Sequence, residues 1–336
     1  MANPNRFSNF LALLLLLPPA GCSQTSFRHT VREGTGSATS GPPGASPRNI
    51  TPTQTLAVYE PWFGHPLHIK VGYSSQDPVA IKKQIQQAKK MGISGFVIDW
   101  YGDREPFLDK SYALIQKIAA QQDFHVAMMF DEADQPADQA TDDALAAFDK
   151  FNEQYLSAGA AGRKAYLEYR GQPVIFIFPK SGHTDWKRVR TETNRWKTPP
   201  LLIQEYPAAG AEEAFDGFYA WINAGKKGWA PDGSNWGEDY LRDFYHSMQT
   251  KYPGKIAVGA AWAGFDDRKA SWGLGRYISQ RCGATYADTT KLQQEYYPVS
   301  SPLPFLLIET WNDYEEGSAI ERGLAKCEDD GKSSGR

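Results

Sequence analysis

The sequence has few cysteines, little excess charge of either sign and no long hydrophobic run. Only three of its 336 residues are cysteine, Cys22, Cys282 and Cys327, which excludes a small scaffold held together by many disulfides. The formal net charge of -3 comes from 36 Lys and Arg against 39 Asp and Glu, so no basic surface attracts nucleic acid. A phosphate-binding loop and a serine-nucleophile elbow are also missing. The sequence therefore indicates a globular protein whose site is neither a nucleic-acid surface, a phosphate-binding loop nor a serine-nucleophile elbow.

The N-terminal residues 1–21 are predicted to be a secretory signal peptide of the lipoprotein type. Arg6 supplies a positive charge, Leu11 to Leu17 form an apolar run, and Ala20 and Gly21 precede Cys22. The run is too short to span a bilayer as a helix. Because the ending resembles a bacterial lipoprotein signal, we expect lipidation at Cys22. The protein would then be exported and held in the bacterial cell envelope by its lipid, facing the periplasm or the exterior. Export without lipid and a buried apolar helix are the alternatives.

The next segment, residues 22–54, is expected to be a tether. It is rich in Ser, Thr, Gly and Pro and has almost no large apolar residues, so it cannot bury enough surface to fold. The folded domain is predicted to be residues 55–336. Cys282 and Cys327 both lie in it and would pair in an oxidising compartment only if the fold brings them close together.

Short apolar runs alternate with amphipathic stretches throughout the predicted domain. Eight runs are predicted strands: Leu56–Glu60, Gly95–Trp100, His125–Phe130, Pro173–Phe178, Leu201–Glu205, Gly217–Trp221, Ile256–Trp262 and Pro304–Thr310. Helices are expected between them, including Pro78–Met91, Leu108–Gln121, Asp142–Ala158 and Gly237–Lys251. In the first of these, Asp77 and Pro78 are typical of a helix start, and Gly92 of a helix end.

Eight strand–helix units predict an α/β fold, a single-domain (β/α)8 or TIM barrel. An open, doubly wound sheet is the alternative, but no Gly-x-Gly-x-x-Gly turn follows a predicted strand. Little sequence follows the eighth strand, so either the last helix is reduced or the C-terminus is truncated.

Acidic and aromatic residues gather where the predicted strands end. The active sites of such barrels form at the carboxyl ends of the strands. The expected substrate-binding residues are Tyr59, Glu60, Trp62, Asp99, Trp100, Tyr101, Asp131, Glu205, Trp221 and Trp262. Carboxylates bind sugar hydroxyls, and aromatic rings stack on the apolar faces of sugars. Any one of these residues is more often a loop cap or a rim contact, but the set indicates a carbohydrate site.

Asp313 and Glu316 follow the eighth predicted strand and are three residues apart, which places both side chains on one side of a turn. Hydrolysis of a glycosidic bond requires one protonated and one ionised carboxyl group. Two neighbouring carboxyls push their pKa values apart, which supplies that difference. A solvated helix start is the alternative for such an acidic cluster.

His65 and His68 raise the question of a metal site. A metal ion needs three or four converging ligands, and two loop histidines beside prolines are more often surface or substrate-contacting groups. We therefore predict neither a metal nor a cofactor.

The motif Asn-Asp-Tyr-Glu-Glu-Gly-Ser-Ala-Ile-Glu at residues 312–321 resembles the Asn-Glu-Trp-His-Glu-Gly-Thr-x-Ile-Glu stretch of the glycoside hydrolase family 99 endo-α-mannosidases and their family 71 relatives. Residues 59–64, 95–102 and 264–267 add to the resemblance, which covers about residues 56–323. It implies a retaining mechanism. In it Asp313 acts through the 2-hydroxyl of the substrate, forming an anhydro-sugar, and Glu316 is first acid and then base.

The same resemblance implies that Asn312 binds substrate. Two residues depart from the family motif, since Asp313 is one methylene shorter than the family's Glu and Glu315 replaces its His.

The sequence thus predicts an exported glycoside hydrolase that cleaves α-linked glycans, either α-mannosides or α-glucans. Its expected partners are an oligo- or polysaccharide and the membrane, with no nucleic acid. A non-catalytic glycan-binding lipoprotein on the same barrel is the first alternative. A barrel enzyme of other chemistry, such as a lyase or a deacetylase, is the second.

Overall fold

The computed structural model describes residues 52–102, 104–132, 136–180, 182–206, 212–223, 230 and 232–326. The predicted signal peptide, the lipidation site Cys22 and most of the predicted tether lie outside the described residues, as does Cys327. The first described strand begins one residue before residue 55, the predicted start of the folded domain. Gln54 is already in the first strand, and the hydroxyl of Thr53 donates a hydrogen bond to the carbonyl of Leu303 (2.8 Å).

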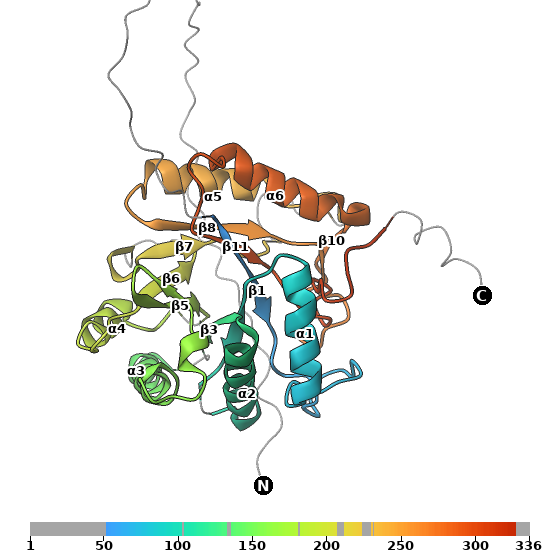
Figure 1. The fold of residues 1–336 in the computed structure, drawn as a ribbon. Helices are drawn as coiled ribbons and strands as arrows, with labels where there is room; N and C mark the ends of the chain where they lie inside the picture. Colours follow the sequence, from blue (N-terminus) through green and yellow to red (C-terminus); the bar gives the residue numbers. More distant parts are fainter. Residues whose placement is uncertain are drawn as a thin grey trace, which may run out of the picture. The chain divides into compact units, whose positions relative to one another are not determined.

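Eight parallel strands form a closed barrel, as predicted (Figure 1). They are β1 (Gln54–Tyr59), β2 (Gly95–Trp100), β3 (His125–Asp131), β5 (Gln172–Phe178), β6 (Leu201–Glu205), β7 (Gly217–Tyr219), β8 (Ile256–Ala261) and β11 (Phe305–Ile308). Each strand pairs with its sequence neighbours in this set, β3 pairs with β5, and β11 lies between β8 and β1. Two small additions are β4 (Glu168–Tyr169), antiparallel to β5, and the hairpin of β9 (Phe265–Asp266) and β10 (Tyr277–Ile278).

In the part of the chain that the structure describes, six α-helices surround the strands (Figure 1). They are α1 (Pro78–Lys90), α2 (Pro106–Gln122), α3 (Ala140–Phe151), α4 (Trp186–Thr193), α5 (Glu238–Thr250) and α6 (Ala284–Tyr296). The predicted start of α1 is confirmed, because the Asp77 side chain accepts a hydrogen bond from the N–H of Val79 (2.8 Å). Gly92, just beyond its end, has a φ of 81°, which glycine adopts without strain.

The repeating pattern weakens at three places. α3 ends at Phe151, earlier than predicted, and continues as a short π-helix, η1 (Asn152–Leu156). In the described residues between β6 and β7 the helical structure is one 3-10 turn, η3 (Glu212–Ala214). No helix follows β11 within residues 309–326. In the described part of the chain, the eighth strand–helix unit therefore has a strand but no helix. Two further 3-10 turns are η2 (Arg163–Ala165) and η4 (Arg281–Gly283).

Strand side chains alternate between two apolar layers. Val58, Val97, Phe176 and Leu307 belong to the cluster that fills the barrel, whereas Ile98 and its equivalents pack against the helices. Because successive side chains point to opposite faces, the next inward position on each strand lies at the carboxyl end of the barrel. Polar residues hold several of these positions: Glu60, Asp99, Asp131, Glu205 and Glu309.

Glu309 is fully buried at the end of β11. Neither of its carboxyl oxygens has a partner in good hydrogen-bond geometry among the described residues. Burial raises the pKa of Glu309 well above its ordinary value; the backbone N–H of Ile222 opposes this rise and the charge of Glu205 adds to it. The folded protein therefore favours the protonated form of Glu309.

We predict that Glu309→Gln increases the free energy of unfolding at high pH. An unfolded Glu ionises near pH 4.3, so the wild type loses stability as the pH rises above that value toward the raised folded pKa, while the amide does not titrate. The gain should be small near pH 4 and on the order of 2 kcal/mol at pH 8. Guanidinium unfolding at a series of pH values measures it.

The matched control is Glu213→Gln, because the Glu213 side chain is 83% exposed and pairs loosely with Lys187 (3.2 Å). This variant should follow the wild type at every pH. If Glu309→Gln did the same, Glu309 would not be held protonated by the fold.

Candidate active site

Five carboxyl groups meet at the carboxyl end of the barrel. Glu60, Asp99, Asp131 and Asp313 are each 5% exposed or less. Burial raises the pKa of Glu60 well above its usual range, and the charges of Asp99, Asp313, Glu316 and Asp131 raise it further. The five groups therefore lie within electrostatic range of one another. Glu60 directly follows β1, Asp99 and Asp131 lie in the last two residues of β2 and β3, and the other two groups follow β11, so the cluster joins the first and last strands of the barrel.

Lys180, just after β5, is a cation within this cluster. Its ammonium lies 2.6 Å from one oxygen of Asp131 and 4.8 Å from the centre of the Tyr101 ring. Burial lowers the pKa of Lys180, but the charges of Asp131 and Asp99 outweigh this effect and raise it. Lys180 thus stays charged and offsets part of the repulsion among the acids. The sequence analysis missed it, because it stands in a loop without periodicity.

Asp313 is fixed by a turn of its own backbone. One carboxylate oxygen accepts hydrogen bonds from the N–H groups of Glu315 and Glu316, both at 2.9 Å. Its own N–H donates to the hydroxyl of Thr310 (2.8 Å). Burial and the charge of Glu316 raise the pKa of Asp313 well above its usual range, and the two N–H donors oppose this rise.

Glu316 is held from a different loop. The indole N–H of Trp272, between β9 and β10, donates to one carboxylate oxygen of Glu316 at 2.9 Å. Burial raises the pKa of Glu316, and the Trp272 hydrogen bond and the charge of Arg276 lower it. The two carboxyls predicted to act together therefore have separate sets of donors. Trp272 is a further residue that the sequence analysis missed.

Asn312 ties the segment after β11 to the end of β1. Its side-chain oxygen accepts from the N–H of Glu60 (2.8 Å), and its amide donates to the carbonyl of the same residue (2.9 Å). Asn312 has no exposed surface. Asn312 therefore positions Glu60 beside Asp313. The sequence had predicted a contact between Asn312 and the substrate.

Three aromatic residues expected in the site lie outside it. Tyr59, Trp100 and Trp262 are fully buried in the layer between strands and helices. The Tyr59 hydroxyl donates to Gln84 of α1 (2.9 Å), and the Trp100 indole donates to Asp109 of α2 (3.2 Å). For Tyr59 and Trp100 the reason is strand alternation, since their neighbours Glu60 and Asp99 take the inward positions.

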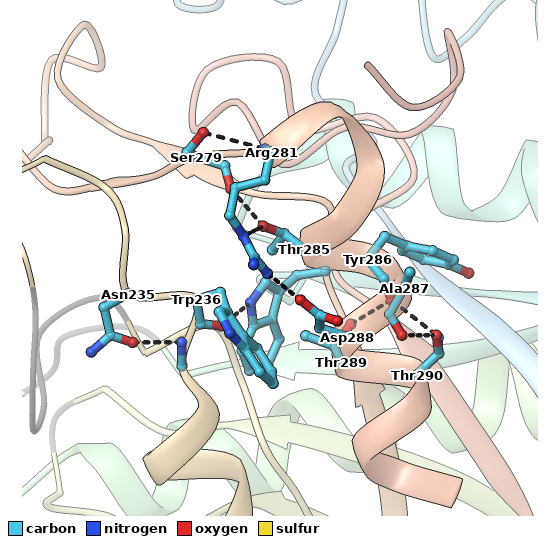
Figure 2. Close-up of polar contacts among 12 residues, drawn as sticks. Asn235, Trp236, Ser279, Arg281, Thr285, Tyr286, Ala287, Asp288, Thr289 and Thr290 are labelled. Carbon is cyan, nitrogen blue, oxygen red and sulfur yellow. Dashed lines mark hydrogen bonds and ion pairs between the residues drawn. The ribbon is translucent and has the colours of Figure 1, made fainter. Parts of the chain in front are cut away.

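Trp262 instead supports the loop that leads into α5. Its indole N–H donates to the carbonyl of Trp236 (2.9 Å). The Arg281 guanidinium lies 5.6 Å from the Trp236 ring and pairs with Asp288 of α6 (2.7 Å; Figure 2). Cys282, the next residue, is disulfide-bonded. This group of contacts fastens α5 and α6 to the barrel close to its carboxyl end.

The other expected residues stay near the barrel's carboxyl end. Tyr101 lies against Lys180, and Trp221 packs edge-on against Phe178 (5.3 Å between ring centres). Glu205 is half-buried at the end of β6. Within the described part of the chain, no three His, Cys, Asp or Glu side chains are arranged to hold a metal ion.

Comparison with solved structures supports the barrel. The chain is similar to the family 99 endo-α-mannosidase of Bacteroides thetaiotaomicron in complex with bis-tris-propane, with 20% identity, a TM-score of 0.60, and coverage of 80% of this chain and 86% of that chain. A second structure of that enzyme gives 19% identity, a TM-score of 0.58 and coverage of 80% and 87%. A glycoside hydrolase-like protein gives 13% identity, a TM-score of 0.53 and coverage of 82% of this chain and 89% of that chain. At these identities the likeness concerns the fold.

No curated protein matches the chain closely enough to count as a relative. The family model described as glycosyl hydrolase family 71 matches residues 64–257, which is more than half of the chain. This match covers β2 and β3, which carry Asp99 and Asp131, and also Lys180 just after β5. The chain therefore belongs to glycosyl hydrolase family 71 and is a glycoside hydrolase.

Proposed function

We propose that the enzyme cleaves α-linked glycans, either α-mannosides or α-glucans, with retention of configuration, using Asp313 and Glu316. The observation that carries the proposal is the buried carboxyl cluster, in which these two acids are neighbours held by different donors. The structural neighbours that are endo-α-mannosidases favour an α-linked substrate. The family match ends at residue 257, so the roles of the two acids rest on this geometry and on the motif after β11.

In the proposed first step, written for an α-mannoside because its 2-hydroxyl lies trans to the departing oxygen, the Asp313 carboxylate removes the proton of that 2-hydroxyl, and its oxygen attacks the anomeric carbon. Glu316 gives its proton to the departing glycosidic oxygen. In the second step, ionised Glu316 takes a proton from water, whose oxygen attacks the anomeric carbon and opens the anhydro-sugar. Asp313 then returns its proton to the 2-hydroxyl oxygen. Burial, which raises the pKa of Glu316, suits an acid that must start protonated.

We expect Asp313→Asn and Glu316→Gln each to reduce kcat about 1000-fold on an unactivated α-glycan, because amides keep the packing but lose the proton chemistry. Reducing-end assays over a panel of α-mannosides and α-glucans measure the loss. Glu295→Gln, an exposed change on α6, is the control and should keep full activity. A near-normal rate in either site variant would remove that residue from its role.

That panel also tests the non-catalytic alternative. Glycan binding without cleavage by the wild type would favour a binding protein on a family 71 barrel. The departure at Asp313, one methylene shorter than the residue in the motif it resembles, is the feature that motivates this comparison.

The stereochemistry of the reaction separates this mechanism from others. NMR of the first-formed product should show the anomeric configuration of the substrate, because two displacements at one carbon restore it. A 2-deoxy substrate should bind but be cleaved at least about 100-fold more slowly, since Asp313 then has no hydroxyl to act through. Release of the opposite anomer, or rapid cleavage of the 2-deoxy substrate, would contradict it.

We further propose that the enzyme is exported and anchored by a lipid on Cys22. The support is the Arg6, Leu11–Leu17 and Gly21-Cys22 pattern. Among the described residues, no helix has the length and apolar character needed to cross a membrane.

Cys22→Ala should move the protein from the membrane pellet to the soluble fraction, because a tether of polar residues offers no other anchor. Cys282→Ala is the matched control and should leave the fractionation unchanged. Sedimentation of Cys22→Ala with membranes would end the lipid-anchor proposal.

A further inference from the structure

Three aromatic rings form a cluster beside Glu316. The imidazole of His68 stacks on the indole of Trp62, with centres 4.8 Å apart and planes 3° from parallel. Trp272 packs edge-on against both rings, 6.5 Å from Trp62 and 6.3 Å from His68. Two rings come from the loop after β1 and one from the loop between β9 and β10. This ring cluster of Trp62, His68 and Trp272 therefore joins two loops that are distant in sequence.

The ring cluster holds two successive carboxylates. The Nδ1 atom of His68 lies 2.7 Å from one oxygen of Glu315, and the indole N–H of Trp272 donates to Glu316 at 2.9 Å. The other oxygen of Glu315 accepts from the N–H of Ile69 (3.2 Å). Both oxygens of Glu315 are thus in contact with the loop after β1.

The His68–Glu315 pair is shielded from solvent. The side chains are 18% and 7% exposed, respectively, so water screens their interaction only weakly. The residue type at this position differs from the motif that the chain resembles, because that motif has His where Glu315 stands. Here the histidine comes from the loop after β1, and the carboxylate comes from the segment after β11.

Trp62 depends on this pair for its place. Its indole N–H is buried and has no hydrogen-bond partner among the described residues, so packing alone orients the ring. His68 covers one face of Trp62, and the edge of Trp272 abuts both rings. The base of the Trp272 loop is fixed separately, since Asp267 accepts from the N–H groups of Leu274 and Arg276. Loss of His68 would therefore release the rings without unfolding the loop.

We propose that His68 and Glu315 are positioning residues that lock the ring cluster and, through Trp272, fix the orientation of Glu316. The inference rests on the proposed role of Glu316 as acid and base. Neither residue takes part in the chemical steps. Their effect falls on the rate of those steps, because a carboxyl that loses its rigid donor spends less time aligned with the glycosidic oxygen.

The test uses the full chain with His68→Gln, Glu315→Gln and the exchanged pair His68→Glu/Glu315→His. Each single change should lower kcat about tenfold, with KM changed less than threefold. The exchanged pair restores a histidine–carboxylate contact between the two loops but not the ring stacked on Trp62, so it should recover part of the lost kcat. Exposed His246→Gln and Glu295→Gln are the matched controls for the loss of a histidine and of a carboxylate.

A second measurement requires no substrate. In protein labelled with ¹⁵N-tryptophan, the Trp272 indole N–H resonance is assigned by its loss in Trp272→Phe. Its exchange with water should be about tenfold faster in the single variants than in the wild type, and intermediate in the exchanged pair, because a loosened donor opens to solvent more often. This readout stays valid even if Glu316 has no catalytic role.

Two results would overturn the inference. One is an unchanged Trp272 resonance and exchange rate in both single variants. The other is an exchanged pair no better than the single variants in kcat or in Trp272 exchange, while thermal unfolding shows all the proteins to be folded. If the single variants showed the expected faster exchange at Trp272 but the wild type did not hydrolyse any glycan, the result would count only against the proposed function.

Discussion

Several carboxyl groups are buried together in one small space, and the other interactions of the site compensate for this burial. Glu60, Asp99, Asp131 and Asp313 are all nearly inaccessible to water, and an isolated charge in such a place costs several kcal/mol. The protein responds in two ways. Lys180 neutralises part of the charge through its contact with Asp131. Burial also raises the pKa values of Glu60 and Asp99 well above their usual range, which favours their protonated forms.

Contacts between segments that are far apart in the chain hold the loops of the site together. Asn312 grips the backbone of Glu60, 252 residues away. Glu315 meets His68 across 247 residues. Short-range contacts, such as the backbone donors to Asp313, set the local shape, whereas these long-range contacts set the distance between the loops. The barrel supplies the frame, since β11 lies directly beside β1.

The barrel was predictable because its signals are local. Apolar runs, the Asp77 cap and the Gly92 stop lie within a few residues of what they determine. The positions of Glu60, Asp99 and Asp131 were predictable because each ends a strand. The prediction placed Tyr59 and Trp100 wrongly because it considered the type of residue and not the alternation of side chains along the strand. Val58 and Val97 face the interior, so Tyr59 and Trp100, at odd spacings from them, face the helices. By the same alternation Glu309, two residues after Leu307, faces the interior.

Other residues had no such signal. Lys180 and Trp272 stand in loops, where neither periodicity nor spacing fixes the direction of a side chain. The meeting of His68 with Glu315 depends on the closed barrel and on the course of two loops. A single sequence shows the two residues but not their contact.

The place of β11 in the barrel also fixes when the barrel can close during synthesis. This strand inserts between β8 and β1, and the segment with Asp313 and Glu316 comes after it. Closure must therefore wait until a ribosome has made every other strand of the barrel, and it requires a strand that pairs across about 250 residues, a slow kind of contact. Until β11 is in place, a nascent chain cannot bring Asp313 and Glu316 beside Glu60.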